Sequence, residues 1–369
     1  MNALKNMKKT TRSNLITYAI VVLFYIVAQG LASGGILNNS MKGMLVPICT
    51  YVVLAISLNL TVGILGELSL GHAGFMSVGA FSGAVFWVVS GSNMPSVLGL
   101  ALSMLIGGVV AGVFGFLIGI PVLRLRGDYL AIVTLAFGEI IKNVLNTVYL
   151  GIDSAGFHFS IKDSASMGLA PDGDVIINGA IGISGMKKAS TFLAGIILIL
   201  ITLFVILNLI NSRAGRAIMS IRDNRIAAEA TGINVTKYKL MAFIVSAVFA
   251  GMAGVLYALN FSALAAKKFD YNTSILVLVF VVLGGIGNIR GSMIAATVLY
   301  VLPELLRGVA DYRMLVYAIV LIVMMIFNQS PQIVAWREQM AERIAENPKL
   351  RQWMARRKKD GAQSEKGEA

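Results

Sequence analysis

Only a few ionisable residues interrupt the long apolar stretches of this sequence, and they are the side chains that could do chemistry. Glu67 and His72 flank the segment GELSLGHAGF, and Glu139 and Lys142 lie one helical turn apart. A charge at the centre of a membrane-spanning helix costs roughly 2.5 to 3.5 kcal/mol on insertion scales, so such positions suggest a function. For Glu139 and Lys142 we expect an ion pair on one helix face, with a proton or ion relay as the alternative. For Glu67 and His72 the alternatives are a satisfied polar turn and a helix break that lines a pathway.

Motifs for nucleotide, metal or nucleophilic chemistry are weak or missing. The sequence has no Gly-Lys pair and therefore no Walker A loop, and the glycines of LGGIGNIRG at 283–291 do not form a dinucleotide-binding G-x-G-x-x-G. The GISG at 182–185 matches the G-x-S-G of intramembrane serine proteases, but we expect Ser184 in a polar segment, and nothing places His72 or His158 beside it. The single cysteine, Cys49, excludes an intrachain disulfide, and no His and carboxylate cluster suggests a metal. We expect a chain that is not an enzyme and has no cofactor of its own.

Membrane-spanning helices must position these residues. The chain has 369 residues, of which 57% are hydrophobic and 13% charged, and its mean hydropathy is +0.79. This composition indicates an integral membrane protein, in which each span needs about 20 mostly apolar residues. We therefore expect an all-α, polytopic transmembrane helix bundle of about 8 to 10 spans, in which the third and eighth apolar runs are broken or re-entrant. The predicted spans lie near 15–33, 43–65, 72–90, 97–122, 129–150, 191–211, 238–260, 272–286, 293–309 and 312–328.

The distribution of basic residues predicts the topology. An even number of crossings puts both chain ends, the segment around Arg124 and Arg126, and the 212–239 loop on one side, and all of these are rich in Lys or Arg. The positive-inside rule places that side in the cytoplasm, which explains the net charge of +13 better than nucleic-acid binding does. The predicted parts are a cytoplasmic N-terminus at 1–14, a permease domain at 15–328 with an extracytoplasmic segment at 151–190 and a cytoplasmic coupling loop at 212–237, and a basic cytoplasmic tail at 329–369.

Two of these parts carry further expectations. The segment at 151–190 is polar enough to form a short β-rich or irregular cap on which a partner could dock. In the tail, Trp336, Met340 and Ile344 recur at helical spacing, which predicts either an amphipathic helix on the lipid surface or a solvated end.

Glycine interrupts two apolar segments in comparable places in the two halves of the chain. These are GILGELSLGHAGFMSVGAF at 63–81 and LGGIGNIRGSMIAA at 283–296. In transporters, such interruptions mark unwound backbone whose free N–H and C=O groups can line a substrate path, although glycine also permits close helix packing. The predicted pathway residues are Glu67, Gly71, His72, Gly74, Glu139, Gly284, Gly285 and Gly287.

The loop at 212–239 holds more charge than topology requires. It contains six basic residues, together with Asp223 and Glu229. The run IAAEA at 226–230 favours helix, Asn224 or Asp223 could cap its start, and Gly232 could end it. We expect a short amphipathic helix at the cytoplasmic face, held by the spans on both sides.

This loop resembles the Glu-Ala-Ala...Gly coupling loop of ATP-binding-cassette import permeases through Ala228, Glu229, Ala230 and Gly232. The surrounding sequence is similar to the branched-chain amino-acid permease family in particular, and so are the blocks at 57–81, 123–140 and 282–307, in the same order. Thr231 and the absence of a downstream proline depart from the general importer loop.

The resemblance implies the membrane-spanning permease subunit of an ATP-driven importer in the bacterial cytoplasmic (inner) membrane. Its partners would be a second, related permease, two cytoplasmic ATPase subunits that bind ATP and Mg, an extracytoplasmic solute-binding protein, and membrane lipids. The implied cargo is Leu, Ile or Val, with urea or short amides as alternatives, and a stand-alone ion-coupled transporter is the rival mechanism. The ATPase-coupling residues would be Arg222, Asp223, Asn224, Ala228, Glu229, Ala230 and Gly232.

Overall fold

The computed structural model describes residues 9–35, 38–90, 93–123, 125, 127–154, 156–171, 173–306 and 312–329. The chain forms two compact units, Met1–Leu305 and Leu306–Ala369. The first unit contains eleven helices and all the strands among the described residues, and α12 (Arg313–Gln329) belongs to the second. The basic tail predicted at 329–369 lies, except for its first residue, outside the described residues.

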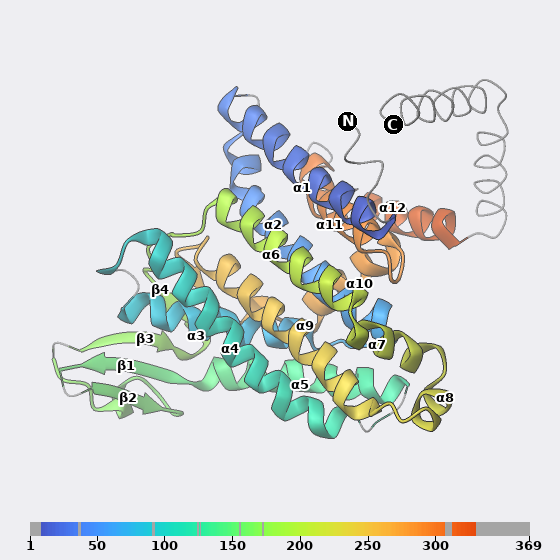
Figure 1. Ribbon diagram of the computed structural model, residues 1–369. Coiled ribbons are helices and arrows are strands. Elements are labelled where there is room, and N and C mark those ends of the chain that lie inside the picture. The colour runs from blue at the N-terminus through green and yellow to red at the C-terminus, as the bar shows by residue number, and fades with distance from the viewer. Residues whose placement is uncertain are drawn as a thin grey trace, which may run out of the picture. The chain divides into compact units, whose positions relative to one another are not determined.

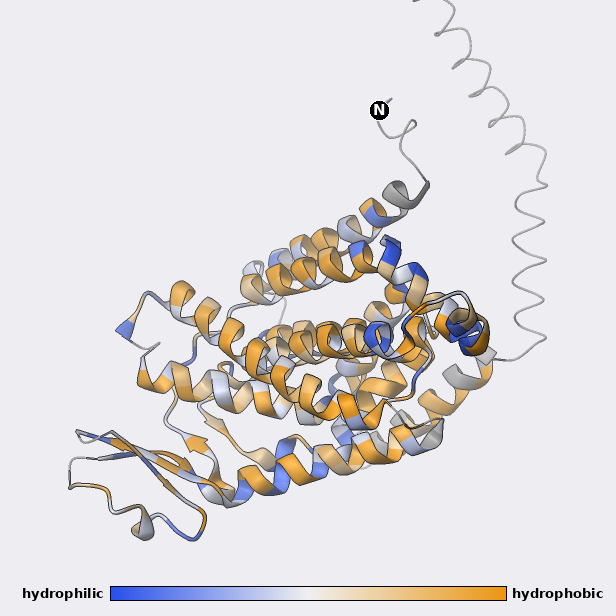
Figure 2. Cartoon of the chain, turned by 60° about the horizontal axis from the view of Figure 1, so that its bottom comes forward, coloured by the Kyte–Doolittle hydropathy of each residue, from blue (hydrophilic) through white to orange (hydrophobic). Residues whose placement is uncertain are grey.

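Ten apolar helices form where the sequence predicts spans, and Figure 2 shows that hydrophobic residues cover most of their length. They are α1 (Lys9–Ser33), α2 (Asn39–Asn59), α3 (His72–Val89), α4 (Ser96–Val122), α5 (Asp128–Thr147), α6 (Phe192–Asn211), α9 (Val235–Ala258), α10 (Tyr271–Gly284), α11 (Ile289–Leu305) and α12. Within the described residues, seven of them are long and apolar enough to cross a membrane. That number is slightly below the predicted 8 to 10 because α10, α11 and α12 have only 14, 17 and 17 residues.

Small residues bring α3, α4 and α9 into backbone contact at the centre of the first unit. A Cβ atom added to Gly79 of α3 would lie 2.3 Å from the Cα of Gly251 on α9, and one added to Gly107 of α4 would lie 2.7 Å from the carbonyl oxygen of Gly79. Such contacts are the basis of close helix association in membranes. Beside these helices runs α2, whose second half is buried and includes Cys49, the buried apolar residue that the sequence predicts.

Both predicted glycine interruptions are true helix breaks. After Asn59 the α2 helix continues as a single π-helical segment, η1 (Leu60–Leu65), and Gly66 then ends it at a φ of +79°. The chain runs without helix until α3 begins at His72. The second break is the turn at 285–288 between α10 and α11, where Gly285 and Gly287 have φ values of +94° and +82°. We call these segments, 66–71 and 285–288, the first and second breaks.

The segment predicted as an outer cap folds as a small antiparallel sheet. Its strand order is β2-β1-β3, with β1 (Tyr149–Asp153), β2 (Gly156–Ser160) and β3 (Asp174–Asn178). The register pairs Tyr149 with Ser160, and a bulge between Leu150 and Gly151 shifts the pairing with β3. The short 3-10 turn η3 (Ala165–Met167) lies between β2 and β3. A second 3-10 turn, η4 (Gly179–Ile181), leads to β4 (Ile183–Ser184), which pairs with β5 (Ala263–Leu264), and η5 (Ala266–Lys268) follows β5.

Two short helices, α7 (Arg213–Asp223) and α8 (Arg225–Ala230), connect α6 to α9. In Figure 1 the three-stranded sheet lies at one end of the first unit and α7 and α8 lie at the other, with α5 running between the two ends. The two segments that the sequence assigns to opposite sides of a membrane are therefore far apart in the fold.

Candidate functional site

The predicted coupling loop folds as a pair of capped helices. Ser212 accepts a hydrogen bond from the N–H of Gly215 at the start of α7, and the Oδ1 atom of Asn224 accepts one from the N–H of Ala227 at the start of α8. Thr231 follows the last residue of α8, and Gly232 then reverses the chain at a φ of +82°, a conformation that glycine adopts at little cost. The predicted helix and its end near Gly232 are confirmed, and of the two predicted cap residues, Asn224 and Asp223, it is Asn224 that caps α8.

One face of α8 is anchored and the other is free in the described structure. Ala228 is buried with Ile221 of α7 and Val235 of α9 in a small apolar cluster. On the opposite face Ile226 is 80% exposed, and Arg225 forms an ion pair with Glu229 at 2.9 Å, one turn along the helix. Like Glu229, Ala230 is exposed. The helix thus presents an apolar side chain beside a charged pair. We call α7 and α8 together the coupling platform, after the coupling loop that the sequence predicts there.

Arg222 joins this platform to the first break. Its Nη1 atom donates a hydrogen bond to the carbonyl oxygen of Gly63 in η1 at 3.1 Å, and its Nε and Nη2 atoms donate to Asp223. Its side chain also lies against Gly66, where an added Cβ would come within 2.6 Å of the Arg222 Cγ atom. A π-helical turn is rare and is often found at functional positions.

Glu67 lies beside the same platform. Its carboxylate forms an ion pair with Lys239 at the start of α9, and its N–H donates to the carbonyl oxygen of Thr61. Between the first break and α8 lies a cavity of about 490 Å³, which these charged residues line. Its wall includes the predicted coupling residues Arg222, Asp223, Asn224 and Glu229 and the predicted pathway residue Glu67. The structure therefore brings together residues that the sequence assigns to two different roles.

The other pathway residues of the first break are buried between helices. The Nε2 atom of His72 lies 2.8 Å from the Oγ atom of Ser57 on α2, and His72 is 2% exposed. Gly71 and Gly74 let α5 approach, because an added Cβ would lie 2.5 Å from the carbonyl oxygen of Thr134 in one case and 2.9 Å from the Cα of Gly138 in the other. These three residues hold the start of α3 in place.

Glu139 and Lys142 form the ion pair that their spacing predicts. The other carboxylate oxygen of Glu139 accepts a hydrogen bond from the N–H of Tyr271 at 3.1 Å, which satisfies one of the free N–H groups at the start of α10. The pair therefore connects α5 to α10.

The glycines of the second break have different surroundings. Gly284 packs against the backbone of Gly291 and Ser292, so an added Cβ would lie 2.3 Å from the Ser292 nitrogen. Gly287 lines a cavity of about 500 Å³ with a mixed polar and aliphatic wall that includes Arg290, and its N–H donates to the side chain of Asn59 at 2.8 Å. Neither Asn59 nor Lys239 was among the predicted site residues. An asparagine inside the apolar run SLNLTVGIL is the signal that could have identified the first of them.

The histidines have other partners than Ser184. His72 contacts Ser57, and His158 contacts Asp153 at 3.0 Å and the carbonyl oxygen of Met167. Ser184 is an exposed residue of β4. Among the described residues there is no group of three or more His, Cys, Asp and Glu that could hold a metal ion.

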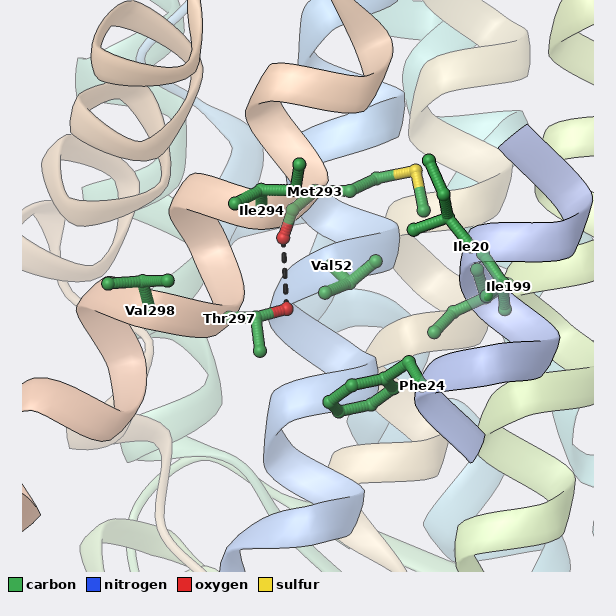
Figure 3. Close-up of a pocket in the computed structure, with 9 residues that line it drawn as sticks. Ile20, Phe24, Val52, Ile199, Met293, Ile294, Thr297 and Val298 are labelled. Atoms are coloured by element: carbon green, nitrogen blue, oxygen red, sulfur yellow. Dashed lines mark hydrogen bonds between the residues drawn. The ribbon is translucent and has the colours of Figure 1, made fainter. Parts of the chain in front are cut away.

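An apolar cavity of about 200 Å³ lies between α1, α2, α6 and α11 (Figure 3). Its one hydroxyl group, on Thr297, donates to the carbonyl oxygen of Met293 at 2.9 Å, and the rest of the wall is aliphatic or aromatic, including Phe24 and Val52. This lining offers no free polar partner for the charged ends of an amino acid. We therefore do not assign the cavity to a substrate path.

Apolar helices, two glycine breaks and a supported amphipathic helix at one end define a multi-pass membrane protein of the permease class. The family model described as the permease component of branched-chain amino acid transport systems matches residues 40–327, and the chain belongs to this family. No solved structure matches the chain significantly.

Relatives of known function support this assignment. The chain is 36% identical over 305 residues to the high-affinity branched-chain amino acid transport system permease protein LivM of Escherichia coli, an alignment that covers 79% of this chain and 69% of the relative. LivM of Salmonella typhimurium is 35% identical over 301 residues, with the same coverage. LivH of Salmonella typhimurium, also a permease protein of that system, is 23% identical over 258 residues, which cover 69% of this chain and 81% of LivH.

Proposed function

We propose that this chain is the membrane-spanning subunit of an ATP-driven importer that moves Leu, Ile and Val from an extracytoplasmic binding protein into the cytoplasm. The chain would pair with a second, related permease and would be driven by two ATPase subunits that bind ATP and Mg. It would lie in the bacterial inner membrane with both termini in the cytoplasm. The names of the LivM and LivH relatives support both the cargo and the existence of two kinds of permease subunit.

The observation that carries the proposal is the contact between Arg222 and the carbonyl oxygen of Gly63. An ATPase that moved α8 would also move α7, because Ala228 and Ile221 pack in one cluster. Arg222 at the end of α7 would then displace the π-helical turn that precedes the first break. The exposed face of α8, with Ile226 and Glu229, is where the ATPase would dock.

Of the eight pathway residues that the sequence suggests, only two are proposed here to border the substrate pathway itself. We propose that Glu67 and Gly287 border the inner end of the pathway, because each lines a cavity next to a break. Gly71, His72, Gly74, Glu139, Gly284 and Gly285 would act by allowing or fixing the helix ends around it.

Reconstitution tests the function directly. The chain, its related permease and the two ATPase subunits, placed in proteoliposomes with the solute-binding protein outside, should take up labelled leucine only when ATP is present. Glu229→Arg and Gly232→Trp should abolish this uptake while the complex still inserts and assembles. The charge reversal Arg213→Glu, at the first residue of α7, is the control and should retain most uptake. Normal uptake by both α8 variants would refute the coupling assignment, and competition by urea but not by isoleucine would refute the cargo.

The ion-coupled alternative makes the opposite forecast for Glu139. Glutamine at this position keeps an acceptor for the N–H of Tyr271 but cannot carry a proton or an ion-pair charge. Under our proposal Glu139→Gln therefore leaves ATP-driven uptake largely intact. Uptake by the purified chain alone, driven by a proton or sodium gradient and lost in Glu139→Gln, would establish the alternative.

A further inference from the structure

Asn59, the last residue of α2, ties the end of this helix to the second break. Its Oδ1 atom accepts a hydrogen bond from the N–H of Gly287 at 2.8 Å, and its Nδ2 atom donates one to the Oγ atom of Ser292 at 2.8 Å. Both Asn59 and Ser292 are 0% exposed, and the Oγ–H of Ser292 donates a hydrogen bond to the carbonyl oxygen of Asn288 at 3.1 Å. One side chain from the first half of the chain thus contacts the turn of the second break and the helix that follows it.

Gly63 makes room for this arrangement. A Cβ atom added there would lie 1.9 Å from the Oδ1 atom of Asn59 and 2.3 Å from the nitrogen of Gly287. Any side chain at this position would therefore push the amide of Asn59 away from the second break. The glycine in η1 is required by the contact between Asn59 and the second break, in addition to any need for backbone freedom.

The same Gly63 carries the contact from the coupling platform. Its carbonyl oxygen accepts from Arg222, while its α-carbon faces Asn59 and Gly287. The π-helical hydrogen-bonding pattern of η1 separates this turn from the regular helix of α2. π-helical turns are rare and often lie at functional sites.

We infer that Asn59 is a positioning residue that makes the two breaks move as one element. A displacement of Arg222 reaches Gly63, and Asn59 carries it to Gly287 and Ser292, and so to α11. This inference rests on the proposed function, because it takes ATP-driven motion of α7 and α8 as the input. Asn59 belongs neither to the predicted coupling residues nor to the predicted pathway residues.

The test measures leucine imported per ATP hydrolysed by the complete transporter in proteoliposomes. Asn59→Ala should lower this ratio about tenfold, because two buried hydrogen bonds are lost, while ATP hydrolysis continues at a near-normal rate. Ser292→Ala removes one of the two bonds and should lower the ratio less. Ser103→Ala is the matched control, since Ser103 is equally buried but donates to the carbonyl oxygen of Gly99 in its own helix.

A merely structural role would reduce import and hydrolysis together and leave their ratio unchanged. An unchanged ratio in assembled Asn59→Ala therefore overturns the inference. If Asn59→Ala does not assemble, an unchanged ratio in Ser292→Ala overturns the inference instead. A wild-type complex that imports no leucine with ATP would instead mean that the proposed function has failed.

A double variant tests the order of the contacts. Arg222→Ala alone should also lower the ratio, because it disconnects the platform from Gly63. In the Asn59→Ala background, Arg222→Ala should cause little further loss, since both residues act in series through the same turn. If Arg222→Ala lowers the ratio by the same factor with and without Asn59→Ala, then Asn59 does not transmit the motion of Arg222.

Discussion

Lys239 of α9 and Glu67 of the first break form an ion pair although they lie 172 positions apart in the sequence. The side chain of Lys239 is only 4% exposed and that of Glu67 is 16% exposed. The pair fixes the start of the first break against the helix that follows the coupling platform, and it lies in the wall of the cavity beside α8.

Replacing Lys239 by methionine should strongly destabilise the first unit. The change leaves the carboxylate of Glu67 with no opposite charge in a mostly buried position, and breaking a buried pair in this way costs about 3–5 kcal/mol. Thermal unfolding of the detergent-solubilised protein, followed by tryptophan fluorescence, should show a lower midpoint. Lys237→Met, which removes an exposed charge two residues earlier, should leave the midpoint almost unchanged.

Exchanging the two charges gives a second check on the same pair. The double variant Glu67→Lys with Lys239→Glu should recover a large part of the lost thermal stability. A double variant no more stable than Lys239→Met would show that the attraction between the charges is not what stabilises this contact.

Ile226 should be the main apolar contact between α8 and its ATPase. It is 80% exposed, whereas its neighbours in the cluster beneath α8 are buried, so Ile226→Asp should spare the fold and weaken docking. The measurement is the amount of ATPase subunit that copurifies with the permease. Ile161→Asp, at a residue 64% exposed after β2, is the matched control and should retain the ATPase. Equal retention by both variants would remove Ile226 from the interface.

Gly79→Val should prevent the packing of α3 against α9. The new Cβ would meet the backbone of Gly251 at 2.3 Å, and a helix backbone cannot yield as a flexible side chain can. We expect little monodisperse protein in size-exclusion chromatography. Gly30→Val, on α1 where nothing lies within 4 Å of an added Cβ, should elute like the wild type. A well-behaved Gly79→Val protein would contradict the observed helix contact.

The turn before η3 should respond to acid. Hydrogen bonds from the side chain and the backbone N–H of Ser166 hold the pKa of Asp163 below its usual value. The bond to the N–H of Ser166, at 2.7 Å, therefore adds stability above the ordinary pKa of the carboxyl, and this is lost as the pH falls through the lowered pKa. Hydrogen exchange at Ser166, corrected for intrinsic rates, should lose protection in that window. The amide of Ala194, bonded to the hydroxyl of Thr191, should not.

The sequence was sufficient for most of the helices because each apolar run is long and ends in polar or glycine-rich residues. Local rules also predicted the cap at Asn224, the end of α8 near Gly232 and the ion pair between Glu139 and Lys142, since the partners in each case are within four positions. The same rules placed α10 within two residues of its observed ends, but they placed α11 four residues too late, because the turn of the second break already ends at Asn288.

The long-range contacts of the site could not be read from the pattern. Gly63 looks like one more small residue of an apolar run, and its closest approaches are to Asn59 and to Gly287, which is more than half the chain away. The partner of Glu67 is Lys239, which composition alone assigns to the positive-inside charge of the loop. Contacts between polar residues that are far apart in the sequence leave no periodic pattern. They can therefore be identified only from the folded structure.

At the end of the first unit that carries the sheet, hydrogen bonds to main-chain carbonyl groups connect segments that lie far apart in the sequence. Ile183 and Ser184 pair with Leu264 and Ala263, Ala189 donates to the carbonyl oxygen of Leu259, and Trp87 donates to that of Lys187. At the opposite end, single side-chain contacts such as the one from Arg222 to Gly63 join the coupling platform to η1. Under the proposed function, the end with the sheet would therefore stay fixed, and the helices would tilt about it when the ATPase moves α8.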